Sequence, residues 1–161
     1  MNICYKFNIF AFGNTFFSIN DSVYAELILD GIHVNFAAAK ALLRAKGKDK
    51  VVLITDSMEA AGLPDGTYSL GGQPVYVVGK EARLADGALA GSIANMNECA
   101  KNASQNLNLE LYEAINLATY NPAQSLHEDM IGEIKEGNYA DIIFIDEDID
   151  IKNVIIKGNV K

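Results

Sequence analysis

Histidine is scarce in this sequence, because only His33 and His127 occur among 161 residues. A metal-dependent hydrolytic site normally draws several imidazoles from one chain, so two histidines limit the metal chemistry that the chain can support alone. Cysteine is equally scarce: Cys4 and Cys99 lie far apart, and there is no CxxC pair. That usage is typical of a reducing compartment rather than of a secreted disulfide framework, and we expect a cytoplasmic protein.

Positively charged residues are also few: the sequence has 13 Lys and Arg but 21 Asp and Glu, which gives a formal net charge of −8. This is the wrong sign for neutralising a phosphate backbone, so we expect no nucleic-acid partner. The Phe-rich start is interrupted by Asn8 and Gly13 and is too short to cross a bilayer, so we expect no membrane partner either. Residues 1–24 are expected to be a strand or loop packed on the core, or a segment that once packed against further sequence.

Half of the sequence is apolar, and its regular patterns begin at residue 25. Residues 25–29 read as a buried strand, and Asn35 can cap a helix that runs to Lys46 and ends at Gly47. Residues 51–55 form a nearly continuous apolar run, which is typical of a strand covered on both faces. A strand–helix–strand unit of this length predicts two parallel strands, whose exit loops emerge at the same carboxyl edge of the sheet.

Two candidate functional residues follow these strands. Asp56 directly follows the second strand, where a partly dry setting suits a carboxyl group that takes and gives protons; alternatively it only caps the turn through Ser57 and Met58. His33, in the first exit loop, could bind substrate, ligate a metal or simply hydrogen-bond its own loop. His127 lies in a polar stretch and is expected at the surface.

The segment between the second strand and the next helix predicts a β excursion. Residues 67–70 and 75–78 read as strands, and Gly71-Gly72 indicates a hairpin turn rather than a phosphate loop, because no GK[ST] follows. A small-residue turn, Leu89-Ala90-Gly91-Ser92, then precedes a helix, so its backbone N–H groups could approach a ligand closely. Ser92 is expected to be an N-cap rather than a nucleophile.

The remaining sequence predicts helices followed by short strands. Apolar stripes over residues 93–107 and 111–118 indicate two helices, the second ended by Asn121-Pro122. The tail is expected to be β at Ile134, at 140–145 and at 154–156. The acids between the last two strands lack EF-hand spacing and predict a solvated loop.

Several of these segments recur in the order and approximate spacing of one known family. They are Ala25-Glu26-Leu27-Ile28, Asp30-Gly31-Ile32-His33, Thr55-Asp56-Ser57-Met58, Ala61-Gly62, Gly66-Thr67-Tyr68, Leu89-Ala90-Gly91-Ser92, Asn121-Pro122-Ala123, Gly132-Glu133-Ile134, Gly137 and Ala140-Asp141. Together they resemble the C-terminal portion of the N-acetylglucosamine-6-phosphate deacetylases, which belong to the amidohydrolase superfamily.

The resemblance implies an α/β fold: the last two βα units of a (β/α)8 TIM-type barrel plus part of a small β-sandwich. Residues 1–24 would be a divergent apolar segment. Residues 25–130 would be the partial barrel, with a β insertion near 66–87, and residues 131–161 would supply sandwich strands.

The resemblance also implies roles for individual residues. Asp56 would be the catalytic acid/base that takes a proton from an activated water and delivers it to the departing amine. The remaining site residues would bind the sugar phosphate, and they are Asp30, Gly31, Ile32, His33, Leu89, Ala90 and Gly91. The family uses a divalent metal, with zinc the first candidate, but its metal ligands precede the matched region and have no counterpart here.

The expected function is therefore that of an N-acetylglucosamine-6-phosphate deacetylase fragment, a hydrolase in amino-sugar metabolism, inactive on its own. An alternative is a non-catalytic sugar-phosphate-binding or assembly module; a dihydroorotase-like enzyme is a weaker one, because the turn at residues 89–92 argues against it. A partial barrel exposes strand edges and apolar surface, so we expect a homo-oligomer or a missing N-terminal partner chain.

Overall fold

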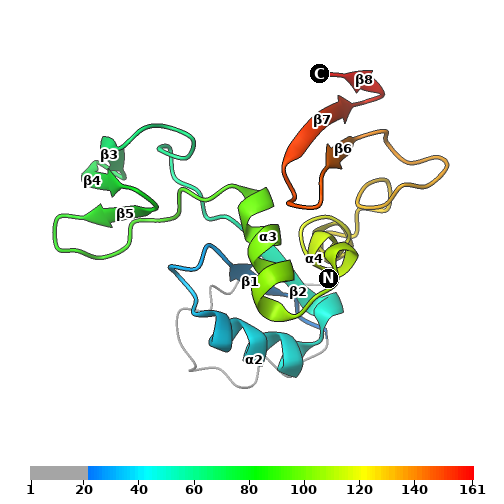
Figure 1. Cartoon of the computed structure of the whole chain (residues 1–161), viewed down its shortest axis with the longest axis horizontal. Helices are drawn as coiled ribbons and strands as arrows, with labels where there is room; N and C mark the ends of the chain where they lie inside the picture. Colours follow the sequence, from blue (N-terminus) through cyan, green and yellow to red (C-terminus); the bar gives the residue numbers. More distant parts are fainter. Residues whose placement is uncertain (1–21) are drawn as a thin grey trace.

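The structure, a computed structural model, describes residues 22–161. The expectation for residues 1–24 lies almost entirely outside this range. Three small sheets and several helices follow one another along the chain (Figure 1). In chain order the elements are β1 (Ala25–Ile28), α2 (Phe36–Lys46), η1 (Lys48–Lys50), β2 (Val51–Ile54), β3 (Gly66–Leu70), β4 (Gln73–Val78), β5 (Glu81–Leu84), α3 (Met96–Leu107), α4 (Leu111–Asn116), α5 (Tyr120–Ser125), β6 (Ile142–Ile145), β7 (Ile151–Ile156) and β8 (Asn159–Val160).

The first sheet consists of β1 and β2, which pair in parallel from Ala25↔Val51 to Ile28↔Ile54. Helix α2 connects them, as the strand–helix–strand pattern predicts. Its N-cap is Asn35, whose side chain accepts a hydrogen bond from the Ala37 N–H at 2.9 Å. Helix α2 ends before Gly47, as predicted, and Gly47 has a positive φ of 81° that glycine adopts readily.

The main core lies between this sheet and helices α2, α3 and α4. Leu27, Leu29, Val51 and Leu53 are all nearly inaccessible to solvent, which explains the unbroken apolar runs in both strands. The helices contribute mostly small residues to the same cluster, so that they approach the sheet closely. These residues are Ala39, Leu42, Cys99, Ala100, Ala103, Leu107, Ala114 and Leu117.

The predicted β excursion is an antiparallel sheet in the order β3-β4-β5 that projects from the central body (Figure 1). Gly71 and Gly72 form the turn between β3 and β4, both with positive φ, so the hairpin prediction is confirmed. Strand β5 was not expected from the sequence. Val75 and Val77 point inward and form a second, smaller core with Ala60 and Ala90.

The helical region differs from the sequence expectation in two places. Helix α3 begins at Met96, with Asn95 as its N-cap, so Ser92 is not the cap. The second expected helix ends at Asn116, and Asn121-Pro122 belongs to the separate helix α5. Pro122 is the third residue of α5, where its missing N–H breaks no intrahelical hydrogen bond.

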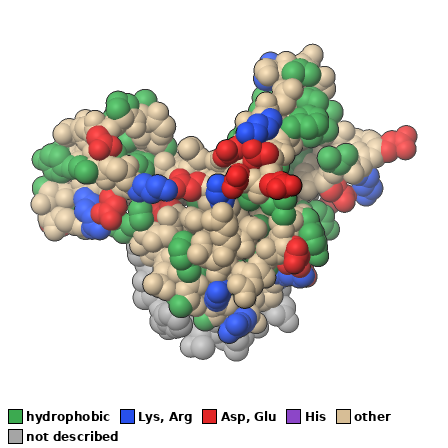
Figure 2. Space-filling view, viewed as in Figure 1, with side chains coloured by type: hydrophobic (Ala, Val, Ile, Leu, Met, Phe, Trp, Pro, Cys, Tyr) green, Lys and Arg blue, Asp and Glu red, His purple; other side chains and the backbone are tan. Residues whose placement is uncertain are grey.

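The tail forms the third sheet, in the order β6-β7-β8. Strand β7 begins at Ile151, three residues earlier than expected, and Ile134 is not in a strand; its side chain is exposed. Every residue of β6 is apolar, and Figure 2 shows hydrophobic side chains gathered over this sheet. The exposed ones on its strands are Ile143, Phe144, Ile151, Ile156 and Val160. None of the helices within residues 22–161 combines the length and apolar character that a bilayer crossing requires.

Candidate functional site

The site expected from the sequence lies at the carboxyl edge of β1 and β2. Both strands end in register at the pair Ile28↔Ile54, and the first residues beyond them enter the two exit loops. Asp30 and Asp56 each stand two residues past that last pair, at equivalent positions on neighbouring strands. The prediction that the two exit loops emerge at one edge is therefore confirmed.

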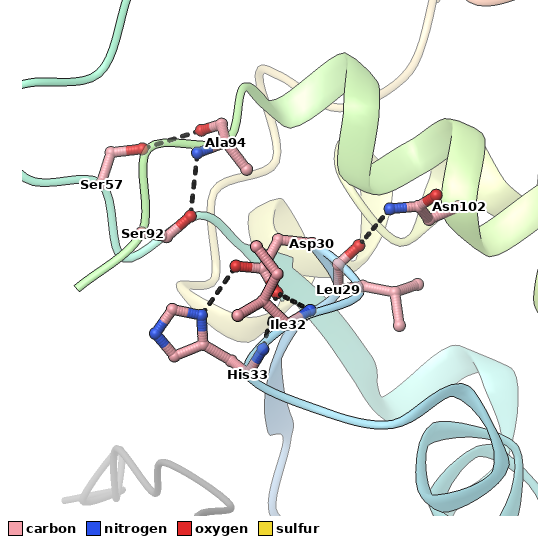
Figure 3. A network of polar contacts seen from close by, with 8 residues as sticks. All are labelled: Leu29, Asp30, Ile32, His33, Ser57, Ser92, Ala94 and Asn102. Atoms are coloured by element: carbon pink, nitrogen blue, oxygen red, sulfur yellow. Dashed lines mark hydrogen bonds and ion pairs between the residues drawn. The ribbon is translucent and has the colours of Figure 1, made fainter. Parts of the chain in front are cut away.

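Asp30 organises the β1 exit loop from within (Figure 3). Its Oδ1 accepts hydrogen bonds from the backbone N–H groups of Ile32 and His33, both at 2.9 Å. Its Oδ2 lies 2.7 Å from His33 Nδ1. The His33 and Asp30 side chains are only 3% and 4% exposed. His33 thus hydrogen-bonds within its own loop, and Asp30 turns toward that loop.

Two opposing effects act on the ionisation of Asp30. Burial raises the pKa of its carboxyl group, but the hydrogen bonds from the backbone N–H groups of His33 and Ile32, together with the His33 ring, outweigh burial. The net result is that the pKa of Asp30 lies below its ordinary value. Asp30 is therefore a carboxylate at neutral pH, and only an acceptor of hydrogen bonds.

Asp56 follows β2 as predicted, but its side chain is exposed rather than held in a partly dry mouth. Its backbone has a left-handed φ of 51°, a conformation that Asp tolerates better than most residues but that still costs energy. The alternative was that Asp56 caps the turn through Ser57 and Met58. In the structure the Met58 N–H donates to Ser92 O at 2.9 Å. What holds this loop is the segment around residue 92.

Residues 91–94 run alongside the β2 exit as a short parallel strap. The Ser92 N–H donates to Asp56 O at 2.9 Å, so Ser92 is bound to the loop by both its N–H and its carbonyl. The Ser57 hydroxyl donates to Ala94 O, and the Ala94 N–H donates to Ser92 Oγ, each at 2.9 Å (Figure 3). These hydrogen bonds, at residues 92 and 94, tie the strap to the backbone of Asp56 and Met58 and to the Ser57 side chain.

The segment 89–91 is held on its other side by the β3–β5 sheet. Leu89 bridges to Arg83, and the Ala90 N–H donates to Ala82 O at 2.9 Å. This Ala90 N–H is therefore already used, and a ligand would meet other backbone groups of the segment. Gly91 has a φ of +83°, and a Cβ at this position would lie 3.2 Å from Asp56 O. Only glycine lets the strap lie this close to the β2 exit.

The described residues do not fit the metal site of a hydrolase. Within residues 22–161 no three His, Cys, Asp or Glu side chains come together as a metal-binding group. His127 is exposed, as expected. Cys99 is fully buried in the core, where burial raises the pKa of its thiol to about 11 and so disfavours a metal-binding thiolate.

Sequence reasoning missed the contacts that join distant segments at this edge. The strap couples residues 57 and 92, and no local pattern marks such a pairing. Asn102, on α3, donates from its side chain to Leu29 O at 2.8 Å and so fixes the end of β1 (Figure 3).

A comparison with known sequence families identifies the chain's relationship. The profile described as "Amidohydrolase family" matches residues 18–161. The chain belongs to the amidohydrolase family. This amidohydrolase is also 42% identical over 142 residues to N-acetylglucosamine-6-phosphate deacetylase of Bacillus subtilis (strain 168), which covers 88% of this chain and 36% of that protein. It thus spans little more than a third of the length of that relative.

A shorter relative is similar over most of its own length. The amidohydrolase is 38% identical over 136 residues to a putative N-acetylgalactosamine-6-phosphate deacetylase of Escherichia coli (strain K12), covering 84% of this chain and 81% of that protein. Among solved structures, it resembles a variant of N-acetyl-D-glucosamine-6-phosphate deacetylase from Mycobacterium smegmatis in complex with N-acetyl-D-glucosamine 6-phosphate. The TM-score is 0.84 at 32% identity, over 89% of this chain and 39% of that one. The expected family and its mixed α/β fold are confirmed.

Proposed function

We propose that this chain forms part of the sugar-phosphate site of an N-acetylglucosamine-6-phosphate deacetylase, with Asp56 as the proton-transferring carboxylate. The reaction yields D-glucosamine 6-phosphate and acetate. The observation that carries the proposal is the strap, because its hydrogen bonds to Asp56 and Met58 hold an exposed acid beside the segment 89–91. The names of the relatives support the same substrate class.

The chemistry of deacetylation gives Asp56 a defined task. Water adds to the acyl carbon, the C–N bond breaks, and one proton from that water must reach the amine nitrogen, which is otherwise a poor leaving group. A carboxylate that first accepts and then donates this proton balances the reaction. The Asp56 side chain is exposed, and its backbone is held by the Ser92 N–H on Asp56 O, with the neighbouring Met58 N–H on Ser92 O. An accessible carboxylate on a tethered backbone suits this task.

The β1 exit loop would provide the sugar-phosphate contacts. In this proposal residues 30–33 line the site beside Asp56, and His33 is the principal contact. Residues 89–91 complete it through backbone groups other than the Ala90 N–H. The equivalence of Asp30 and Asp56 in the parallel register supports this arrangement, since it brings both loops to one edge.

Metal dependence limits what the chain can do on its own. The family is metal-dependent, yet residues 22–161 hold no candidate group of ligands and the whole sequence has two histidines. We therefore expect sugar-phosphate binding without hydrolysis by the chain alone. A non-catalytic binding or assembly module is the second candidate, and the same missing ligand group favours it. Zinc remains the proposed metal of the longer relatives.

The wider architecture follows from the same comparison. In the proposal β1 and β2 are the last two strands of a (β/α)8 barrel, residues 25–130 are its partial barrel with an insertion near 66–87, and residues 131–161 belong to a β-sandwich. The parallel β1–β2 pair and the exposed apolar residues of β6–β8 support this division. We keep the proposal that residues 1–24 form a divergent apolar segment outside the partial barrel.

Exposed apolar surface supports a partner for this chain. The sheets β3–β5 and β6–β8 both display hydrophobic side chains (Figure 2), among them Val78 and Val160. Such patches mark association surfaces, so a homo-oligomer or an N-terminal partner chain is proposed. The buried free thiol of Cys99 suits the proposed cytoplasmic location.

Calorimetric titration of the purified chain with glucosamine 6-phosphate tests the proposal. We expect binding that His33→Ala weakens at least tenfold and that His127→Ala, the matched surface control, leaves unchanged. No binding by the unmodified chain would refute the site. In a second assay, acetate release from N-acetylglucosamine 6-phosphate with added zinc is expected to be absent. Release that Asp56→Asn abolishes would show instead that the chain is catalytically complete.

A further inference from the structure

Helix α3 is hydrogen-bonded to the exits of both strands that carry the candidate site (Figure 3). It follows directly from the strap, whose Ala94 O accepts the Ser57 hydroxyl at 2.9 Å beside the β2 exit. Further along the helix, the Asn102 side chain donates to Leu29 O at 2.8 Å, at the end of β1. One continuous segment of the chain therefore links the two exits.

The Leu29 carbonyl needs a partner from outside the sheet because it lies beyond the β ladder. The register between β1 and β2 ends at Ile28↔Ile54, so Leu29 is the first residue past the last pair. Its side chain is fully buried in the main core, where a backbone carbonyl without a hydrogen bond is costly. Leu29 also meets Cys99 of α3, whose thiol pKa is raised by burial and lowered by a hydrogen bond from the Leu29 backbone. Helix α3 thus contacts Leu29 at two points, three residues apart on one face.

The β1 exit loop is closed on itself, so its attachment at Leu29 decides where it lies. Asp30 Oδ1 accepts the N–H groups of Ile32 and His33, both at 2.9 Å, and Asp30 Oδ2 contacts the His33 ring. These contacts fix the internal shape of the loop. They do not fix its position relative to the β2 exit, which depends on the residue that joins the loop to β1.

We propose that Asn102 is a positioning residue that, through Leu29 O, holds the β1 exit loop at a fixed spacing from the strap and Asp56. The inference rests on the proposed function for the identity of the ligand, whereas the placement of the loop is a property of the chain alone. A ligand that spans both exits binds only when they are correctly spaced. A loop that occupies its place about a tenth of the time would therefore bind that ligand about tenfold more weakly.

A pair of asparagines on α3 provides a matched experiment. Leucine has nearly the shape of asparagine but no N–H donor, so Asn102→Leu leaves Leu29 O without its partner at little cost in packing. Asn106 lies one turn further along the same helix and is also partly buried. Asn106→Leu makes the same chemical change without removing the hydrogen bond to Leu29 O.

NMR without ligand tests the placement of the loop. The unmodified chain should show a scalar coupling through the hydrogen bond between Asn102 Nδ2 and the Leu29 carbonyl carbon; its absence would overturn the proposal even if no variant folds. In Asn102→Leu the backbone amide resonances of residues 30–33 should shift or broaden as a group, while the two N–H groups bonded to Asp30 stay protected from exchange. Asn106→Leu should leave these resonances in place. Equal changes in the two variants, or none in either, would also overturn the proposal.

Titration with glucosamine 6-phosphate tests the consequence for binding. Asn102→Leu should weaken binding about tenfold, and Asn106→Leu should bind like the unmodified chain. A role of Asn102 in stability alone would lower the midpoint of urea denaturation without changing the affinity of the folded chain, so unchanged affinity would overturn the inference and leave the proposed function standing. Absence of binding by the unmodified chain would refute the proposed function instead, and the spectra without ligand would still decide whether Asn102 places the loop.

Discussion

The closeness of the strap to the β2 exit predicts a specific effect of Gly91→Ala. Gly91 has a φ of +83°, where an L-residue costs about 1–2 kcal/mol. The added Cβ would also lie 3.2 Å from Asp56 O and 3.6 Å from Met58 Cβ, so the strap must move by a few tenths of an ångström. Asp56 O accepts the Ser92 N–H at 2.9 Å, and losing that bond adds about 1 kcal/mol.

Gly87→Ala provides the matched control for this experiment. Gly87 has a similar φ of +87°, but a Cβ there would meet nothing within 4 Å. Urea denaturation should therefore show a loss of about 1–2 kcal/mol in Gly87→Ala and about 2–3 kcal/mol in Gly91→Ala. Only Gly91→Ala should also weaken glucosamine 6-phosphate binding. Equal losses of stability with unchanged binding in both variants would refute the view that the strap positions Asp56.

Three further predictions concern stability and reactivity. Asn121→Ala should destabilise the chain by about 2 kcal/mol in urea denaturation, since its buried side-chain amide donates to Lys48 O in η1 and to Val51 O at the start of β2, both at 2.7 Å; a change near zero would contradict this. Cys99, studied in a Cys4→Ser background, should resist alkylation at neutral pH until denaturant is added, because its thiol pKa is raised to about 11 by burial; rapid labelling of the folded chain would be inconsistent with it. Because the pKa of Asp30 is lower in the folded chain than its unfolded value of about 3.9, the unfolded chain binds more protons in that range, so stability should fall as the pH drops below about 4. Asp30→Asn should flatten this acid limb in pH-dependent unfolding curves, and an unaltered limb would count against the prediction.

The central part of the fold could be predicted because local signals there agree with the tertiary contacts. Asn35 and Gly47 delimit α2 by capping chemistry, and the run at 51–54 is apolar because the strand is covered on both faces. The Gly71-Gly72 turn similarly marks its hairpin. These features depend on a few neighbouring residues, which a sequence displays directly.

Where prediction failed, the missing information was non-local or ambiguous. Pro122 reads as a helix terminator, but it is equally acceptable in the first turn of a new helix, which is where it lies. Strand β5 packs through Ala82 and Leu84, but it also contains Glu81 and Arg83, which form an ion pair with each other. These two charged residues break the apolar pattern by which a strand is predicted. Ile134 is apolar yet exposed in this chain.

The candidate site was only half visible in the sequence. Its place at the carboxyl edge follows from the parallel strands, but the expected dry setting of Asp56 required knowledge of what surrounds it, and the side chain is exposed. The inward orientation of Asp30 could have been suspected from its spacing, because an Asp three residues before a His in a tight loop can accept both backbone N–H groups and the ring.

One titration tests the account most directly. Glucosamine 6-phosphate is added to the ¹⁵N-labelled chain, and the backbone amide resonances are followed. The account predicts that the amides of residues 31–33 and those of residues 89–92 shift together with a single dissociation constant, because both loops line one site at the edge of β1 and β2. Shifts confined to one of these loops, or two different dissociation constants, would contradict a single sugar-phosphate site.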